Sequence, residues 1–147
     1  MAGEDSPIDQ DTVDRELAFG VEDPTALTAN RRAFTIMVRN YMFRLVQLFA
    51  LEKEDRLAEL LDYLDEVPDF GAILDDYFDE YDDIDSGPEA RGPEYFRLGD
   101  TDSRLWSVRQ IIKDPVGDHA YQFVATVDLD ASDEAGEVRL SDLRVEY

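Results

Sequence analysis

The chain has 147 residues, of which 36 are acidic and 14 are Lys or Arg, giving a net charge of −22 and a pI near 4.1. Phosphate contacts need clustered Lys and Arg, so this charge balance argues against a nucleic-acid-binding surface of any size. The chain has no cysteine, which excludes disulfides and thiolate metal sites.

Length and hydropathy predict one cytoplasmic domain. A chain of this length buries roughly two-thirds of the surface that its unfolded form exposes. No apolar run approaches the ~20 residues that span a bilayer. The N-terminus, MAGEDSPIDQ, lacks the basic start and the apolar stretch of a signal peptide. We therefore expect a soluble cytoplasmic protein with a single core.

Arginine dominates the basic residues. Only Lys53 and Lys113 are lysines, and the other twelve basic residues are arginines. Many acids and few lysines are expected of a halophilic cytoplasm, where the Debye length falls to ~3 Å at 1 M salt and like charges repel each other less. A GC-rich genome would also favour arginine over lysine, so both explanations stay open.

Residues 1–27 are predicted to be an acidic, solvated leader. They carry a net charge of −7 and include Pro7, Gly20 and Pro24 among few apolar residues. A single domain is predicted to occupy residues 28–147.

Residues 28–50 are predicted to form the central helix. This stretch contains no Gly, Pro or acidic residue and carries a net charge of +4. Thr28 and Asn30 are both candidate N-caps. Apolar residues recur at helical spacing along one broad stripe. The stripe consists of Phe34, Met37, Val38, Tyr41, Met42, Leu45, Leu48 and Phe49.

A second, weaker apolar line on this helix contains Ile36, Phe43 and Val46. A helix that is apolar on two sides is either central to the fold or meets a partner. Arg32 and Arg39 share a face between the two stripes, which favours internal pairing with carboxylates, and a docking or anion site is the alternative. The candidates for partner contact or ion pairing are Arg32, Ile36, Arg39, Phe43 and Arg44.

Two further helices are predicted before a loop at residues 83–93. The second helix carries Leu57, Leu60, Leu61 and Leu64 at helical spacing. Neither Gly nor Pro occurs between residues 50 and 55, so one long bent helix is the alternative. Asp69 is the predicted N-cap of the third helix, whose outer face is acidic.

The apolar period then changes from 3.6 to 2, which predicts four strands at about residues 95–98, 104–113, 119–131 and 138–147. DPVGD at 114–118 and ASDEAG at 131–136 are predicted turns. A phase slip near Ser141 and Asp142 predicts a β-bulge. The fold class is therefore α+β, with about three N-terminal helices followed by a curved antiparallel sheet of about four strands. By analogy of element order, it suggests a nuclear-transport-factor-2-like cone.

Two blocks of sequence carry a family resemblance. NRRAFTIMVRNYMFRLVQL at 30–48 is the first, and IDSGPEARGP with LWSVRQIIKDPVGDHAYQFVATVDLDASDEAG within 84–136 is the second. Together they resemble an uncharacterised domain at the C-terminal end of certain DEAD/DEAH-box helicases, chiefly from actinobacteria. The resemblance implies a non-catalytic appendage of a superfamily 2 ATPase, with no catalytic residues to carry over. The chain itself lacks a GxxxxGK[ST] phosphate loop and a helicase Asp-Glu motif.

The sequence offers few candidate catalytic or metal-binding residues. His119 is the only histidine, so it cannot form a histidine-based zinc site alone, and no nucleophilic triad is marked. The spacing of Asp128, Asp130 and Asp133 invites a calcium loop, but position six is Asp133 rather than Gly and position twelve is Arg139 rather than Glu. No metal or cofactor is expected. Ordinary turn structure is the favoured interpretation of His119, and core packing is that of Trp106 and Tyr121. The alternative is a pocket at the mouth of the cone that uses Trp106, Arg109, Asp118, His119 and Tyr121.

Three functions follow from these patterns. The first is a non-enzymatic accessory domain that acts through protein contacts, with a DEAD/DEAH-box helicase or another protein as the candidate partner. The second is a small-molecule-binding or enzymatic pocket protein of the cone fold. The third, direct nucleic-acid binding through the central helix, is disfavoured by the surrounding acid.

Overall fold

The computed structural model describes residues 26–102 and 104–147 and confirms the α+β class. The helices are η1 (Leu27–Ala29), α2 (Arg31–Ala50), α3 (Glu54–Leu60), α4 (Phe70–Glu80), η2 (Pro88–Arg91), η3 (Pro93–Tyr95) and α5 (Leu129–Ala135). The strands are β1 (Phe96–Asp102), β2 (Leu105–Ile111), β3 (Gln122–Asp128) and β4 (Leu140–Glu146). The predicted leader, residues 1–27, lies outside the described residues except for its last two.

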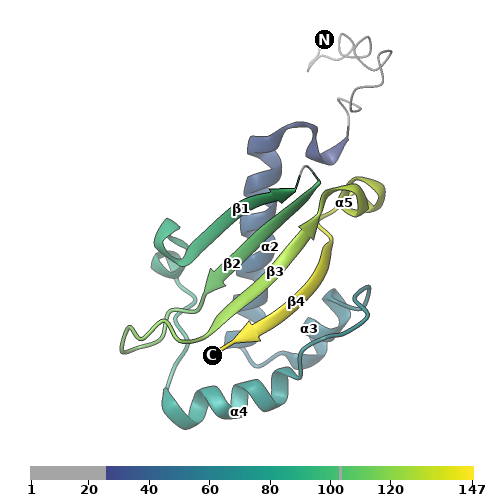
Figure 1. The fold of residues 1–147 in the computed structure, drawn as a ribbon. Coiled ribbons are helices and arrows are strands. Elements are labelled where there is room, and N and C mark those ends of the chain that lie inside the picture. The colour runs from purple at the N-terminus through teal and green to yellow at the C-terminus, as the bar shows by residue number, and fades with distance from the viewer. Residues whose placement is uncertain (1–25, 103) are drawn as a thin grey trace, which may run out of the picture.

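The described elements form two layers. The four strands are ordered β1-β2-β3-β4, and every neighbouring pair is antiparallel. Helix α2 runs along one face of this open sheet, and α3 and α4 lie near the end at which the chain terminates (Figure 1). Within the described residues, no helix covers the opposite face of the sheet (Figure 1).

Helix α2 is the central helix, as predicted, but it begins three residues later than predicted. Asn30 is the N-cap, because its side-chain oxygen accepts the Ala33 N–H at 3.0 Å. Thr28 instead lies in η1, where Asp133 accepts hydrogen bonds from both its backbone N–H and its hydroxyl. Along the predicted apolar stripe, Phe34, Val38, Met42, Leu45 and Phe49 are all fully buried.

The second predicted apolar line is mostly core. Phe43 and Val46 are 3% and 1% exposed, whereas Ile36 is 52% exposed. The expectation that Phe43 is an exposed, partner-facing residue is therefore wrong, because the Arg91 guanidinium lies over its ring and Phe96 of β1 lines the same hollow. Ile36 remains the exposed apolar residue of this line.

A sharp break separates α2 from α3, so the alternative of one long bent helix is wrong. Glu52 adopts a left-handed backbone with φ of 56°, which ends the helical path between the two elements. The second predicted helix is confirmed in its buried Leu57. Asp69 caps α4 as predicted, since its side chain accepts the Ala72 N–H.

The predicted bulge is present in β4. Thr126 pairs with Asp142 and Val127 pairs with Leu140, so Ser141 is the extra residue opposite β3. The next residue, Asp142, also accepts the Thr126 N–H through its side chain. This slip explains why the apolar positions of the last strand change from even to odd.

Residues 129–135 form a helix, whereas a strand end and a turn were predicted there. The Asp128 side chain accepts the Ala131 N–H and caps α5, and Gly136 ends it with φ of 76°. Ser132 is fully buried and its hydroxyl accepts the Arg139 N–H. These local hydrogen bonds override the alternating pattern that predicted a longer β3.

Aromatic rings fill the space between α2 and the sheet. Phe34 packs on Trp106 with ring centroids 5.3 Å apart, and Phe49 packs on Phe123 at 5.4 Å. Buried residues of the long helices and of β2, β3 and β4 belong to one apolar cluster, and partly buried Phe96 and Leu98 of β1 pack against it. In the described ranges, no helix combines the length and the hydropathy that crossing a membrane requires.

A candidate binding groove beside helix α2

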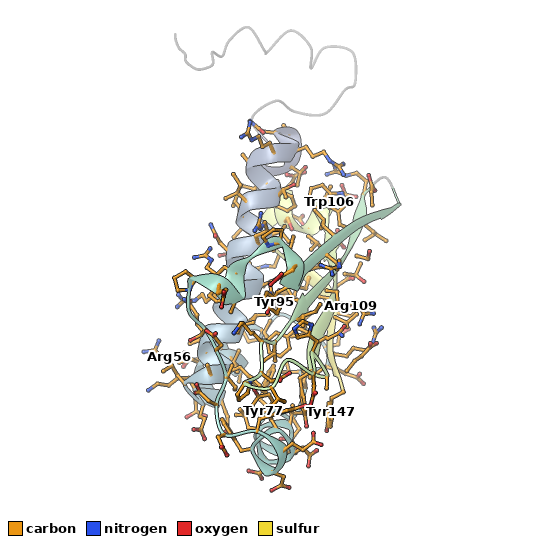
Figure 2. All side chains as sticks on the ribbon, turned by 90° about the vertical axis from the view of Figure 1, so that its left-hand side faces the viewer. Arg56, Tyr77, Tyr95, Trp106, Arg109 and Tyr147 are labelled. Carbon is orange, nitrogen blue, oxygen red and sulfur yellow. The ribbon has the colours of Figure 1, made fainter. Side chains whose placement is uncertain are left out.

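Three of the five residues predicted for partner contact, Ile36, Arg39 and Phe43, line one small groove between α2 and the segment that leads into β1. The groove encloses about 130 Å³. Figure 2 looks onto this edge of the molecule, where α2 lies beside the η2 and η3 turns. The complete lining consists of Ile36, Arg39, Asn40, Phe43, Arg91, Phe96 and Gln110.

The apolar floor of the groove comes from two elements. Phe43 is contributed by α2, and Phe96 is contributed by the first position of β1. The strand register places Phe96 opposite Gln110 of β2, so both residues reach the same part of the sheet. Helix and sheet together therefore supply a floor that neither could form alone.

Two arginines cover this floor. The Arg39 guanidinium carbon lies 5.4 Å from the Phe96 ring centroid, and that of Arg91 lies 5.0 Å from the Phe43 ring centroid. Arg39 also donates to the Arg91 carbonyl at 3.2 Å, and Arg91 donates to the Asn40 side-chain oxygen. These contacts fix the positions of both guanidinium groups.

The expected internal ion pairing of Arg32 and Arg39 is not found in the described part of the chain. Arg32, Arg39, Arg44 and Arg91 form no ion pair with any described residue. Arg31 does form one, with Asp100 at 3.3 Å. Because acids outnumber bases by more than two to one, unpaired arginines gathered on one face are notable.

Gln110 is the buried polar residue of the groove, with 2% of its surface exposed. Its side-chain nitrogen donates to the Tyr95 carbonyl at 3.1 Å and to the Ile111 carbonyl at 3.4 Å. Its side-chain oxygen accepts no hydrogen bond from a described residue. A buried amide oxygen can accept up to two hydrogen bonds, so this atom has unused capacity.

The residues predicted for a cone-mouth pocket do not gather in one place. Trp106 and Tyr121 are buried against the helices, at 2% and 3% exposure. Arg109 lies at an odd position of β2 and faces the other side of the sheet, where it pairs with Glu146 at 2.9 Å. Figure 2 shows Trp106 near the upper end of the molecule and Tyr147, which stacks on Tyr121 at 4.4 Å, near the lower end. Burial and the nearby Tyr147 and acidic groups raise the pKa of Tyr121 to about 12.

Asp118 and His119 belong to a closed turn instead. Asp114 is 3% exposed, and its carboxylate accepts the backbone N–H groups of Val116, Asp118 and His119 at 2.8–3.0 Å. Burial alone would raise the pKa of Asp114, but these backbone hydrogen bonds outweigh it and lower the pKa. The DPVGDH segment that carries part of the family resemblance is thus a structural turn.

His119 and Asp118 have their own contacts in this turn. His119 adopts a left-handed φ of 55° and packs edge-on against Tyr95 at 5.1 Å. Asp118 accepts the Tyr81 hydroxyl at 2.7 Å, and this hydrogen bond to a carboxylate raises the pKa of Tyr81. Acid–base chemistry would need both groups directed at one cavity, and neither lines the groove.

A second, broader hollow of about 380 Å³ lies between the segment after α3, helix α5 and the start of β4. Two of its polar side chains, Tyr63 and Arg139, are bonded internally. The Tyr63 hydroxyl accepts the Leu140 N–H at 3.0 Å and bonds the Tyr41 hydroxyl at 2.8 Å, and Arg139 pairs with Glu137. Within the described residues, no group of three or more metal-ligating side chains is positioned to hold an ion.

Sequence reasoning missed four lining residues of the groove: Asn40, Arg91, Phe96 and Gln110. Asn40 lies four residues after Ile36 on the same helical face, so its helical spacing could have identified it. Phe96 and Gln110 could be found only with the register of β1 and β2. Arg91 lies in a 3₁₀ turn, and no sequence pattern places it over Phe43.

The fold and the groove define a small α+β domain without a recognisable catalytic arrangement in its described residues. The family described as "Domain of unknown function (DUF3516)" matches residues 2–145, and the chain belongs to this family. The match begins within the stretch predicted as a leader. No curated protein and no solved structure gives a significant match.

Proposed function

We propose that this chain is a non-enzymatic accessory domain that works through protein contacts at the α2 groove. The single observation that carries the proposal is the exposed Ile36 beside Arg39 and Arg91, which have no acidic partner among the described residues. Arginine is enriched in protein interfaces and its free N–H donors bind carboxylates, so an apolar side chain beside two arginines without acidic partners fits an interaction site.

The proposed partner is the core of a superfamily 2 helicase. The support for this partner is the resemblance of residues 30–48 and 84–136 to the tail domain of such helicases. The chain would then act on a helicase in trans, or on one to which it is joined. Helicase activity itself is not proposed, because no ATP-binding motif is present in the sequence.

Site-specific crosslinking tests this proposal. A photoreactive amino acid at position 36 of the full chain should capture the helicase core in lysate of the source organism, as identified by mass spectrometry. The matched control carries the same group at position 56, because Arg56 is exposed on α3 and lies away from the sheet (Figure 2). Equal capture at both positions, or none at either, would refute the proposal.

The alternative, a small-molecule or enzymatic pocket of a nuclear-transport-factor-2-like cone, has less support. Helices on one face of the sheet and the bulge at Ser141 favour such a cone. The aromatic packing of Phe34 on Trp106 and of Phe49 on Phe123 occupies the space that its ligand would need. A thermal-shift screen that finds a ligand dependent on Trp106 would revive this alternative.

We also propose that the protein works in a cytoplasm of high salt. The support is the acidic outer face of α4, where Asp75, Asp76, Asp79 and Glu80 are all exposed. Such a surface repels itself less as the Debye length shortens. Melting temperatures should therefore rise steeply with KCl, and equal stability in dilute buffer would contradict the halophilic proposal.

A further inference from the structure

The exposed face of α2 presents cations on both sides of an apolar residue. Arg32, Ile36 and Arg39 are spaced i, i+4 and i+7, so they line one face of the helix. Arg91 joins them from η2, across the groove. The four residues form what we call the α2 groove rim: Arg32, Ile36, Arg39 and Arg91.

The arginines of the rim keep donors free for a partner. A guanidinium carries five N–H donors. Arg39 uses one donor on the Arg91 carbonyl, and Arg91 uses one on Asn40. Contact with Phe96 and Phe43 holds the guanidinium groups over the rings, and their remaining N–H donors can bind carboxylates.

The groove has the size of one side chain. Its volume of about 130 Å³ is close to that of a cavity of roughly 150 Å³ that accommodates benzene. Ile36 and the parts of Phe43 and Phe96 that the guanidinium groups leave uncovered supply apolar contacts for such a side chain. The unused oxygen of Gln110, which is 2% exposed, can accept an N–H from the segment that enters.

Resting on the proposed function, we infer that the α2 groove binds an acidic segment of a partner protein that inserts one apolar side chain. The side chain fills the groove, and carboxylates on both sides of it pair with the rim arginines. This occupant complements the charge and the size of the site together. Binding energy concentrates where an anchor side chain fills a desolvated pocket, and complementary charges around it add specificity.

A nucleic acid fits the same site less well. The flat faces of Phe43 and Phe96, on which a base could stack, are occupied by arginines. A long phosphate backbone would also extend over a surface of net charge −22, whereas a short segment needs only local pairing within a Debye length of ~8 Å. A protein segment is therefore the occupant that the groove favours.

The test uses the full chain and a short fluorescein-labelled peptide of Asp and Glu with one central Leu, read by fluorescence anisotropy. Two variant peptides accompany it: one with Ala in place of Leu, and one with Lys in place of every acid. The Leu peptide should bind at least tenfold more tightly than either. Over the KCl range in which circular dichroism shows the chain folded, added KCl should weaken its binding while the preference for Leu over Ala persists.

Protein variants locate the site. Ile36→Asp and Arg39→Glu should each weaken binding of the Leu peptide about tenfold or more. Arg56→Glu is the matched control, since it makes the same charge change on exposed α3 and should change the affinity by less than about twofold. Circular dichroism melting of each variant separates loss of binding from loss of folding.

Several outcomes would overturn the inference. Equal binding of the Leu and Ala peptides would show that the groove is not filled, and tight binding of the Lys peptide would reverse the charge argument. A dimer by light scattering that Ile36→Asp dissociates would make a second copy the occupant. Tighter binding of a peptide that copies residues 9–22 would make this chain's own acidic segment the occupant.

The proposed function and this inference can fail separately. If position 36 crosslinks to a helicase core while the Leu peptide does not bind, the accessory role stands and the acidic, apolar-anchored segment is wrong. If the Leu peptide binds with the expected variant pattern and no helicase is captured, the inference stands and the helicase partner is wrong.

Discussion

The turn at residues 114–119 and the α2 groove both collect polar residues beside the sheet, but they use them in opposite ways. In the turn, the Asp114 carboxylate accepts three backbone N–H groups, so its hydrogen-bonding capacity is spent inside the fold. In the groove, Arg39 and Arg91 make one donated bond each and no ion pair with a described residue. Polar groups that satisfy the backbone indicate structure. Arg39 and Arg91 instead keep N–H donors that a partner can use.

The largest expected effect is in the turn. Asp114→Ala leaves three backbone N–H groups without their acceptor at a site where the side chain is 3% exposed. Each unsatisfied buried donor costs about 1–3 kcal/mol, and water reaches some of them in the variant, so we expect a loss of about 3 kcal/mol. Urea unfolding followed by circular dichroism measures it.

Two controls accompany this measurement. Asp79→Ala, on the exposed outer face of α4, should change the free energy of unfolding by less than about 0.5 kcal/mol. Asp114→Asn keeps one oxygen acceptor and should lose about 1–2 kcal/mol. If Asp114→Ala is as harmless as Asp79→Ala, the turn is not the structural element that the hydrogen bonds suggest.

The second effect is a pH dependence of the free energy of unfolding that the Asp114 carboxylate of the turn contributes. The folded-state pKa of Asp114 lies below its usual value of about 3.9. A lowered carboxyl pKa contributes stability that is fully present above about pH 4 and is lost as the pH falls through the folded pKa. The stability gap between the wild type and Asp114→Asn should therefore shrink below about pH 4.

In the stability difference between the wild type and Asp114→Asn, the contributions of the other acidic groups cancel. Asp85 beside Lys113 and Glu146 beside Arg109 also have lowered pKa values, but both are present in wild type and variant. Unfolding free energies at about pH 6 and at about pH 3 give the difference. A gap that is constant across this range would mean that the charge of Asp114 does not contribute.

The sequence predicted more of the turn than of the groove, and the reason is the range of the interactions. Helical spacing identified α2, cap chemistry identified Asp69, and a phase slip in the strand pattern identified the bulge at Ser141, because each depends on residues a few positions apart. The groove joins Phe43 of α2 to Arg91 and to the Phe96–Gln110 pair, which lie 48 or more positions further along the chain. Helical spacing in the sequence placed Ile36, Arg39 and Phe43 on α2. It could not show that Phe43 is buried, with Arg91 over its ring and Phe96 in the same hollow.

The missed α5 helix has a different cause. The alternation that predicts a strand through residue 131 continues up to Leu129, which is buried as expected. The Asp128 cap and the left-handed Gly136 then favour one short helix over continued pairing. Both signals are present in the sequence, but cap and strand patterns overlap there and tertiary packing decides between them.

The third effect tests the backbone of the turn. Gly117 has φ of 80°, and a Cβ added there would meet nothing within 4 Å. Gly117→Ala should therefore lose about 1 kcal/mol through backbone strain alone. The matched variant is Gly136→Ala at the end of α5, with φ of 76° and equally open space. A neutral Gly117→Ala would mean that the turn relaxes without the left-handed conformation.

The smallest expected effect is in the groove. Arg91→Ala removes the stacking of a guanidinium on Phe43 and one hydrogen bond to Asn40, contacts that together are worth up to about 1 kcal/mol at a partly exposed site. The free energy of unfolding should accordingly fall by no more than about 1 kcal/mol. A larger loss, comparable to that of Asp114→Ala, would make Arg91 a structural residue like the turn carboxylate. The distinction between a closed turn and an open groove depends on that difference, because only an arginine whose removal leaves the fold intact is free to serve a partner.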